Sequence, residues 1–236
     1  MRKIWAVSEK DLKELVGTVS GFIFLALFLL VGTWLYFQDF FLIGQADPGK
    51  WWSSLSFLML LFVPAIGMGA ISEEKKGKTW ELLLSLPFDE KGLVAGKFLA
   101  RALFLGLALV LSLGVAVTLW WLGKPDLGVM LGGYLSLFMA GLAYLSVVIF
   151  FSSLLSQAAA FLVSFIFILV NSFLTQDLFL LRLPVWARGA AAKLSLGHWQ
   201  AEMAAGLISL SSLIFFITWI SFFLYLAWWQ IKSRNS

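Results

Sequence analysis

No charged residue occurs between Asp126 and Asp177, and this uncharged stretch restricts the fold more than any other feature of the sequence. A single α-helix of that length would measure about 75 Å, whereas the hydrocarbon core of a bilayer is about 30 Å thick. The stretch is therefore expected to cross a membrane twice. Its most polar part, residues 152–157, marks the turn between the two crossings.

The composition agrees with a membrane protein. Hydrophobic residues make up 61% of the 236 residues, charged residues make up 13%, and the mean hydropathy is +0.94. Soluble domains contain roughly 45–50% apolar and about 25% charged residues, so a soluble enzyme is excluded. The absence of cysteine also excludes disulfides, thiolate metal sites and cysteine nucleophiles.

The apolar runs predict an all-α integral membrane protein with six transmembrane helices, since each crossing needs about 20 apolar residues. The predicted spans are 16–37, 52–71, 98–122, 127–151, 158–174 and 207–229, with a cytoplasmic loop at 72–97 and an outer segment at 175–206. Pro64 is expected to kink the second span. Arg101, near the end of the third span, is expected to extend its side chain outward to the membrane interface.

Lysine and arginine are distributed unevenly between the two sides of this arrangement. With the N-terminus inside, twelve of the 17 fall in cytoplasmic segments: Arg2, Lys3, Lys10, Lys13, Lys75, Lys76, Lys78, Lys91, Lys97, Arg101, Lys232 and Arg234. The outer segments hold Lys50, Lys124, Arg182, Arg188 and Lys193. Because cytoplasmic loops are enriched in basic residues, both termini are predicted to be cytoplasmic. The same enrichment explains the net charge of +4, so no nucleic-acid partner is expected.

Residues 1–15 are predicted to form a short amphipathic helix that lies in the membrane interface. At 100° per residue, one side carries Met1, Ile4, Trp5, Ser8, Leu12 and Leu15, and the other carries Lys3, Lys10, Lys13 and Glu14. A helix of this kind places its apolar side in the surface of the bilayer. A frayed charged tail is the alternative interpretation.

The predicted spans contain no pair of ionisable groups that could catalyse a reaction inside the membrane. The one histidine, His198, has no partner for a metal site or a catalytic triad, and no nucleotide-binding loop is present. The chain is therefore expected to have no enzymatic activity, metal site or cofactor of its own. Five polar side chains lie at depth: Tyr134, Tyr144, Ser164, Asn171 and Ser172. They either form interhelical hydrogen bonds or line a substrate path.

The cytoplasmic loop at 72–97 has the features of a docking element. Gly77 interrupts the chain, Thr79 can cap a short helix, and this helix would end before Pro87. A short amphipathic helix in this position fits a groove on a soluble partner, although it could also lie flat on the lipid surface. The candidate docking residues are Glu73, Glu74, Gly77, Thr79, Trp80, Glu81, Leu83, Leu84 and Pro87.

At this loop the sequence resembles the ABC-2 type permeases, the membrane subunits of ATP-driven exporters. The pattern of that family is an acidic-basic-Gly-Thr-x-Glu run, then leucines, Ser-x-Pro and a Gly-Lys pair. It appears here at residues 74–87 and at Gly96-Lys97, with Lys78 as an extra residue. Residues 132–135, 151–157 and 194–199 are similar to the gliding-motility-associated and nitrous-oxide-reductase-maturation branches of the family.

The resemblance implies a permease subunit in a bacterial cytoplasmic (inner) membrane. Two permeases, identical or homologous, would pair above two ABC ATPase subunits that hold ATP-Mg, with an accessory periplasmic or membrane protein as a further partner. The helix at residues 79–86 would then be the coupling helix. A membrane scaffold that anchors an ATPase without moving cargo is the alternative, and an intramembrane enzyme is disfavoured because its catalytic residues are missing.

Overall fold

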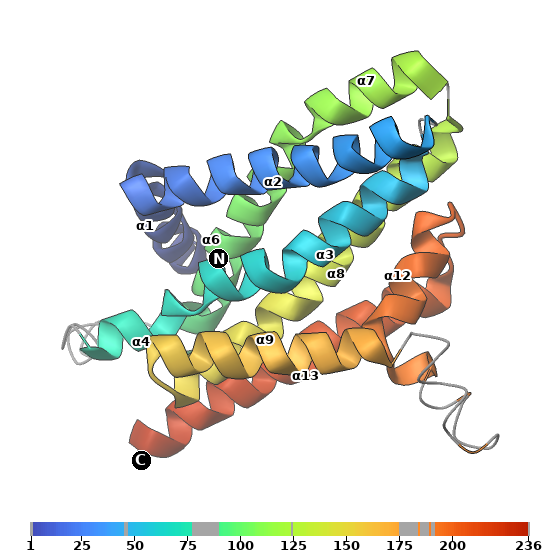
Figure 1. Cartoon of the computed structure of the whole chain (residues 1–236). Helices are drawn as coiled ribbons and strands as arrows, with labels where there is room; N and C mark the ends of the chain where they lie inside the picture. The colour runs from blue at the N-terminus through green and yellow to red at the C-terminus, as the bar shows by residue number, and fades with distance from the viewer. Residues whose placement is uncertain are drawn as a thin grey trace.

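The computed structural model describes residues 2–44, 47–76, 90–123, 125–174, 184, 189 and 192–235. Within these residues the regular secondary structure is α-helical (Figure 1). The helices are α1 (Arg2–Gly17), α2 (Val19–Ile43), α3 (Pro48–Gly67), α4 (Gly69–Lys76), α6 (Glu90–Leu111), α7 (Leu113–Gly123), α8 (Leu127–Leu154), α9 (Gln157–Phe173), α12 (Leu196–Ala204) and α13 (Leu210–Asn235). Thr18, Asp47 and Asp126 cap α2, α3 and α8, because each side chain accepts a hydrogen bond from a backbone N–H in the first turn.

Five helical runs in the described part of the chain are long and apolar enough to cross a bilayer. They are Val19–Gln38, Pro48–Lys76, Glu90–Gly123, Leu127–Leu154 and Leu210–Ser233, and each overlaps one of the spans predicted from the sequence. The remaining predicted span corresponds to α9, whose 17 residues are fewer than the about 20 that a full crossing needs. The five runs confirm a multi-pass membrane protein, whereas the sixth crossing and the orientation of the termini stay predictions.

Helix α8 lies in the middle of the bundle and packs against α3, α6, α9, α12 and α13. In Figure 1 it runs alongside α3 over most of its length. Two glycines allow this close approach: Gly133 of α8 lies against the ring of Trp52, and Gly67 of α3 lies against Val148. The core therefore depends on van der Waals contact between α3 and α8 as well as on the apolar character of both helices.

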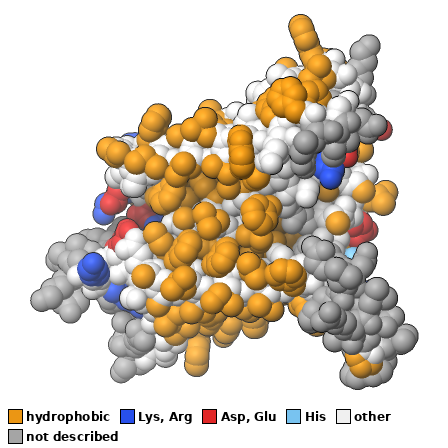
Figure 2. Space-filling model, viewed as in Figure 1, with side chains coloured by type: hydrophobic (Ala, Val, Ile, Leu, Met, Phe, Trp, Pro, Cys, Tyr) orange, Lys and Arg blue, Asp and Glu red, His pale blue; other side chains and the backbone are white. Residues whose placement is uncertain are grey.

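The outer surface of the bundle is apolar. Phe22, Trp121 and Leu131 are 70%, 81% and 70% exposed. Figure 2 shows hydrophobic side chains spread over the face of the helices turned toward the viewer, with most of the visible charged side chains near the ends of the bundle. Because lipid replaces water around a membrane protein, an exposed apolar surface of this extent is the expected one.

The two terminal helices both contact α6 near its beginning. Ile4 and Val7 of α1 lie against Gly96, where an added Cβ would come within 2.9 Å of Val7. On the other side, the Lys91 ammonium group lies 4.4 Å from the centre of the Trp228 ring in α13. Helix α1 and the C-terminal half of α13 therefore lie at the same end of the bundle, as Figure 1 also shows.

Replacing Gly133 with alanine is expected to destabilise the fold, because the added Cβ would lie 2.2 Å from a ring atom of Trp52. Overpacking costs roughly 1–3 kcal/mol, against a gain in helix propensity of at most about 1 kcal/mol. Thermal unfolding in detergent measures the change. Gly114→Ala is the control, since a Cβ there meets nothing within 4 Å, and equal melting temperatures for the two variants would contradict the tight contact.

Candidate functional site

Helix α6 carries two buried cations at the end of the bundle where it contacts α1 and α13. Lys97 and Arg101 are 2% and 5% exposed. Residues four apart lie on the same face of a helix, so the spacing places both side chains side by side. A buried cation is strongly unfavourable unless it is paired, and both side chains have acidic partners.

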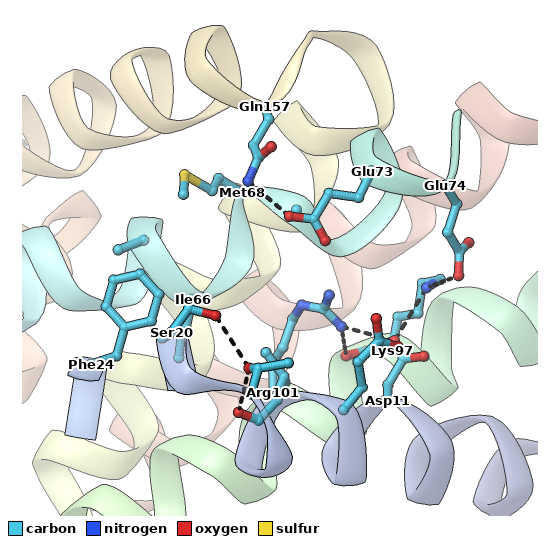
Figure 3. Close-up of a pocket in the computed structure, with 15 residues that line it drawn as sticks. Asp11, Ser20, Phe24, Ile66, Met68, Glu73, Glu74, Lys97, Arg101 and Gln157 are labelled. Carbon is cyan, nitrogen blue, oxygen red and sulfur yellow. Dashed lines mark hydrogen bonds and ion pairs between the residues drawn. The ribbon is translucent and has the colours of Figure 1, made fainter. Parts of the chain in front are cut away.

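The acidic partners come from two helices that are distant in the sequence (Figure 3). The Lys97 Nζ donates to Asp11 Oδ2 at 3.1 Å and to Glu74 Oε1 at 2.6 Å. Arg101 Nη1 donates to the same Asp11 oxygen at 3.1 Å. We call these four residues the ion-pair cluster, and it connects α1, α4 and α6.

Helix α4 is also bound to the end of α8. The Ser152 hydroxyl accepts hydrogen bonds from the backbone N–H groups of Ile71 and Ser72, at 3.0 and 3.2 Å, and donates to the Met68 carbonyl at 2.9 Å. The Lys75 ammonium group donates to the Ser153 carbonyl. These contacts hold α4 between α8 and the ion-pair cluster.

A polar cavity of about 370 Å³ adjoins the cluster. Besides the cluster, its lining includes Glu14 of α1, Glu73 of α4 and Gln157 of α9. The Gln157 amide donates to Glu73 Oε1 at 2.8 Å, as Figure 3 shows. The described lining contains four carboxylates, Asp11, Glu14, Glu73 and Glu74, and two cations, Lys97 and Arg101. The ionised side chains therefore give the cavity a net negative charge.

The structure locates only part of the candidate docking set. Glu73 and Glu74 lie in α4, where Glu73 bonds with Gln157 and Glu74 with Lys97. The other members lie outside the described residues: Gly77, Thr79, Trp80, Glu81, Leu83, Leu84 and Pro87. Their proposed role therefore stays a prediction. The described ends of the loop are α4 and α6, which Glu74 and Lys97 join directly.

The polar residues predicted at depth do not form one cluster. The Tyr134 hydroxyl lies 3.2 Å from Ser112 Oγ, and Asn171 Oδ1 accepts a hydrogen bond from the Leu196 N–H at 3.0 Å at the start of α12. Ser164 is buried in α9. Ser172, in contrast, lines a second cavity at the other end of the bundle together with Tyr144.

The expectation that Arg101 extends outward to the interface is wrong. Its guanidinium group is buried because Asp11 supplies a carboxylate beside it, so no exposure to solvent is needed. The sequence contained a signal for this pairing: two cations four residues apart on an apolar helix need an acidic partner. Asp11 also lies on the same face of α1 as Ser8 and Leu15, since it is three residues from one and four from the other.

These features define a helical, multi-pass membrane protein with a buried ion-pair cluster at one end of the bundle. A model of the ABC-2 family transporter proteins matches residues 5–229, and the chain belongs to this family. Members of the family are membrane components that work with a separate ABC ATPase. No curated protein shows a significant match to the chain. The two branches suggested by residues 132–135, 151–157 and 194–199 stay predictions.

Replacing Asp11 with alanine is expected to destabilise the protein by about 3–5 kcal/mol, because two buried cations lose a shared carboxylate. The control is Glu9→Ala on the same helix, which removes an exposed pair with Lys13 and is expected to change stability by less than about 1 kcal/mol. Denaturant unfolding of the purified protein measures both. Equal changes for the two variants would show that the cluster does not hold α1 in place.

Proposed function

We propose that the chain is the permease subunit of an ABC exporter, in which a partner ATPase supplies the energy for moving a substrate across a bacterial cytoplasmic membrane. Two permeases and two ATPases would form the complex. Family membership and the apolar helices support the general class. The chain itself has no nucleotide-binding loop, so ATP-Mg belongs on the partner.

The observation that carries this proposal is the salt bridge between Glu74 and Lys97, at 2.6 Å. Glu74 in α4 lies near the start of the candidate coupling loop at 72–97, and Lys97 in α6 lies at its end. A force applied to the loop by an ATPase would therefore act on α4 and α6 together. Because Asp11 binds Lys97 and Arg101, α1 would move with them. Such a unit suits the rigid-body motions by which transporters change conformation.

The loop is proposed to contact the ATPase through Trp80 and Glu81, with Leu83 and Leu84 as further apolar contacts. A short helix with apolar side chains and flanking charges fits a groove on a soluble partner. The charges on either side of the helix would orient it in that groove. A scaffold that anchors an ATPase would use the same contacts, so a transport measurement separates the two functions.

Glu81→Arg is expected to lower ATP hydrolysis by the assembled complex about tenfold or more, because a charge reversal at a contact costs at least about 1.4 kcal/mol. The matched control is Glu202→Arg in α12, at the opposite end of the bundle, which should leave hydrolysis unchanged. The measurement is phosphate release by the complex in proteoliposomes. Full activity of a Trp80→Ala/Glu81→Arg double variant would refute the assignment of the coupling loop.

The purified permease alone is expected to release no phosphate from ATP above the level of empty liposomes, whereas addition of the cognate ATPase should restore hydrolysis. A catalytically inactive ATPase is the control for contaminating activity. Hydrolysis that follows the permease through purification and persists without an ATPase would overturn the proposal. ATP-dependent movement of cargo in the same liposomes would exclude the scaffold.

A further inference from the structure

A cavity of about 700 Å³ lies at the end of the bundle opposite the ion-pair cluster. Helices α3, α8, α9 and α12 contribute to its lining. In Figure 1, α12 lies beside the ends of α3 and α8 that are farthest from α4. Ligand cavities in proteins commonly measure about 300–1,000 Å³, so the volume is sufficient for a small organic molecule.

Gln200 of α12 provides a polar side chain in the lining of this cavity. Its side chain is 8% exposed, and its amide nitrogen donates to Ser56 Oγ at 2.6 Å. Ser56 in turn donates to the Trp52 carbonyl at 2.7 Å, so its proton is already used. In the described part of the chain no donor is found for the Gln200 amide oxygen. An amide oxygen has two lone pairs, so that of Gln200 can accept a hydrogen bond from a molecule bound in the cavity.

Apart from Asp47, the remainder of the described lining is apolar or uncharged. Trp52, Phe57 and Leu60 of α3 provide aromatic and aliphatic surface, and Tyr144 and Ser172 add hydroxyl groups.

Among the described lining residues there is no lysine or arginine, and the one acid is Asp47. Its carboxylate already accepts a hydrogen bond from the Gly49 N–H at 2.8 Å as the cap of α3. An anionic ligand would lose its hydration without gaining a counter-charge, whereas an uncharged ligand would have no charge to desolvate.

We propose that this cavity binds an uncharged amphiphile, with its hydrocarbon part against the α3 side chains and a hydroxyl group that donates to the amide oxygen of Gln200. A molecule of this class matches both parts of the lining: the apolar surface of α3 and the acceptor of Gln200. The step from bound molecule to transported cargo rests on the proposed transport function, but binding itself requires no ATPase.

The test uses the full-length permease in phosphatidylcholine nanodiscs with a trace of diacylglycerol that carries a photoreactive diazirine in one acyl chain. After irradiation, mass spectrometry locates the labelled peptides. We expect labelling in residues 47–60 and 196–205. Gln200→Leu should lower this labelling about fivefold, since it removes one hydrogen bond of about 1 kcal/mol while preserving the apolar volume. The matched control, Gln157→Leu in the polar cavity, should leave it unchanged.

A second pair of variants addresses the volume of the cavity. Ala201→Trp fills the space and should abolish labelling, whereas Ala158→Trp, an exposed position on α9, should not. Melting temperatures establish that the variants are folded. Phosphatidic acid with the same diazirine chain should label the cavity at least about tenfold less than diacylglycerol, because burying its charge is unfavourable.

The proposal is overturned if diacylglycerol does not label these peptides, if phosphatidic acid labels them equally, or if labelling survives both Gln200→Leu and Ala201→Trp. A cavity that holds only water would give the first of these results. If diacylglycerol labels the wild-type cavity, the binding site is supported. If it then leaves ATP hydrolysis by the assembled complex unchanged, the link between this site and transported cargo is refuted. The two proposals therefore fail separately.

Discussion

A buried lysine held between two carboxylates determines how one end of this protein is assembled. Lys97 lies on an apolar helix and is 2% exposed, so its buried charge needs an acidic partner close by. Its partners, Asp11 and Glu74, come from α1 and α4. Asp11 also binds Arg101, so the two buried cations of α6 share one carboxylate, and Glu74 provides the second negative charge. The positions of α1, α4 and α6 at this end are therefore coupled to one another.

The two ends of the bundle differ in charge, and α3 and α8 connect them. Ser152 at one end of α8 binds α4, and Tyr144 farther along the same helix lines the uncharged cavity. Helix α3 provides Trp52 at that cavity and continues beyond Met68 into α4. A displacement of α4 would therefore reach the cavity through two helices that pack tightly against each other. This arrangement gives the proposed coupling loop a physical connection to the proposed ligand site.

Much of the architecture could be predicted from the sequence, because a bilayer imposes a simple length and polarity rule on each crossing. Hydropathy predicted the membrane class, and the pattern at residues 74–87 predicted the ABC-2 family, which the family match confirms. The pairing of Asp11 with Lys97 and Arg101 was not predicted. Ion pairs between distant segments depend on how helices pack, and Asp11 stands among charged residues of α1 that are exposed. The bounds of α9, in contrast, lie within one residue of the span predicted at 158–174.

The chemistry of the ion-pair cluster also explains why α1 does not rest on apolar contacts alone. Ile4, Val7 and Leu12 supply apolar contacts for α1, but contacts of this kind tolerate rotation and sliding because dispersion forces have little directionality. Charged hydrogen bonds are directional, and a carboxylate shared by two cations permits few alternative registers. Replacing a buried ion pair by apolar residues can increase stability, so stability alone is a weak explanation for such a cluster. We interpret Asp11 as the residue that fixes the register of α1 on α6, which a helix must keep if it is to move with its neighbour rather than slide along it.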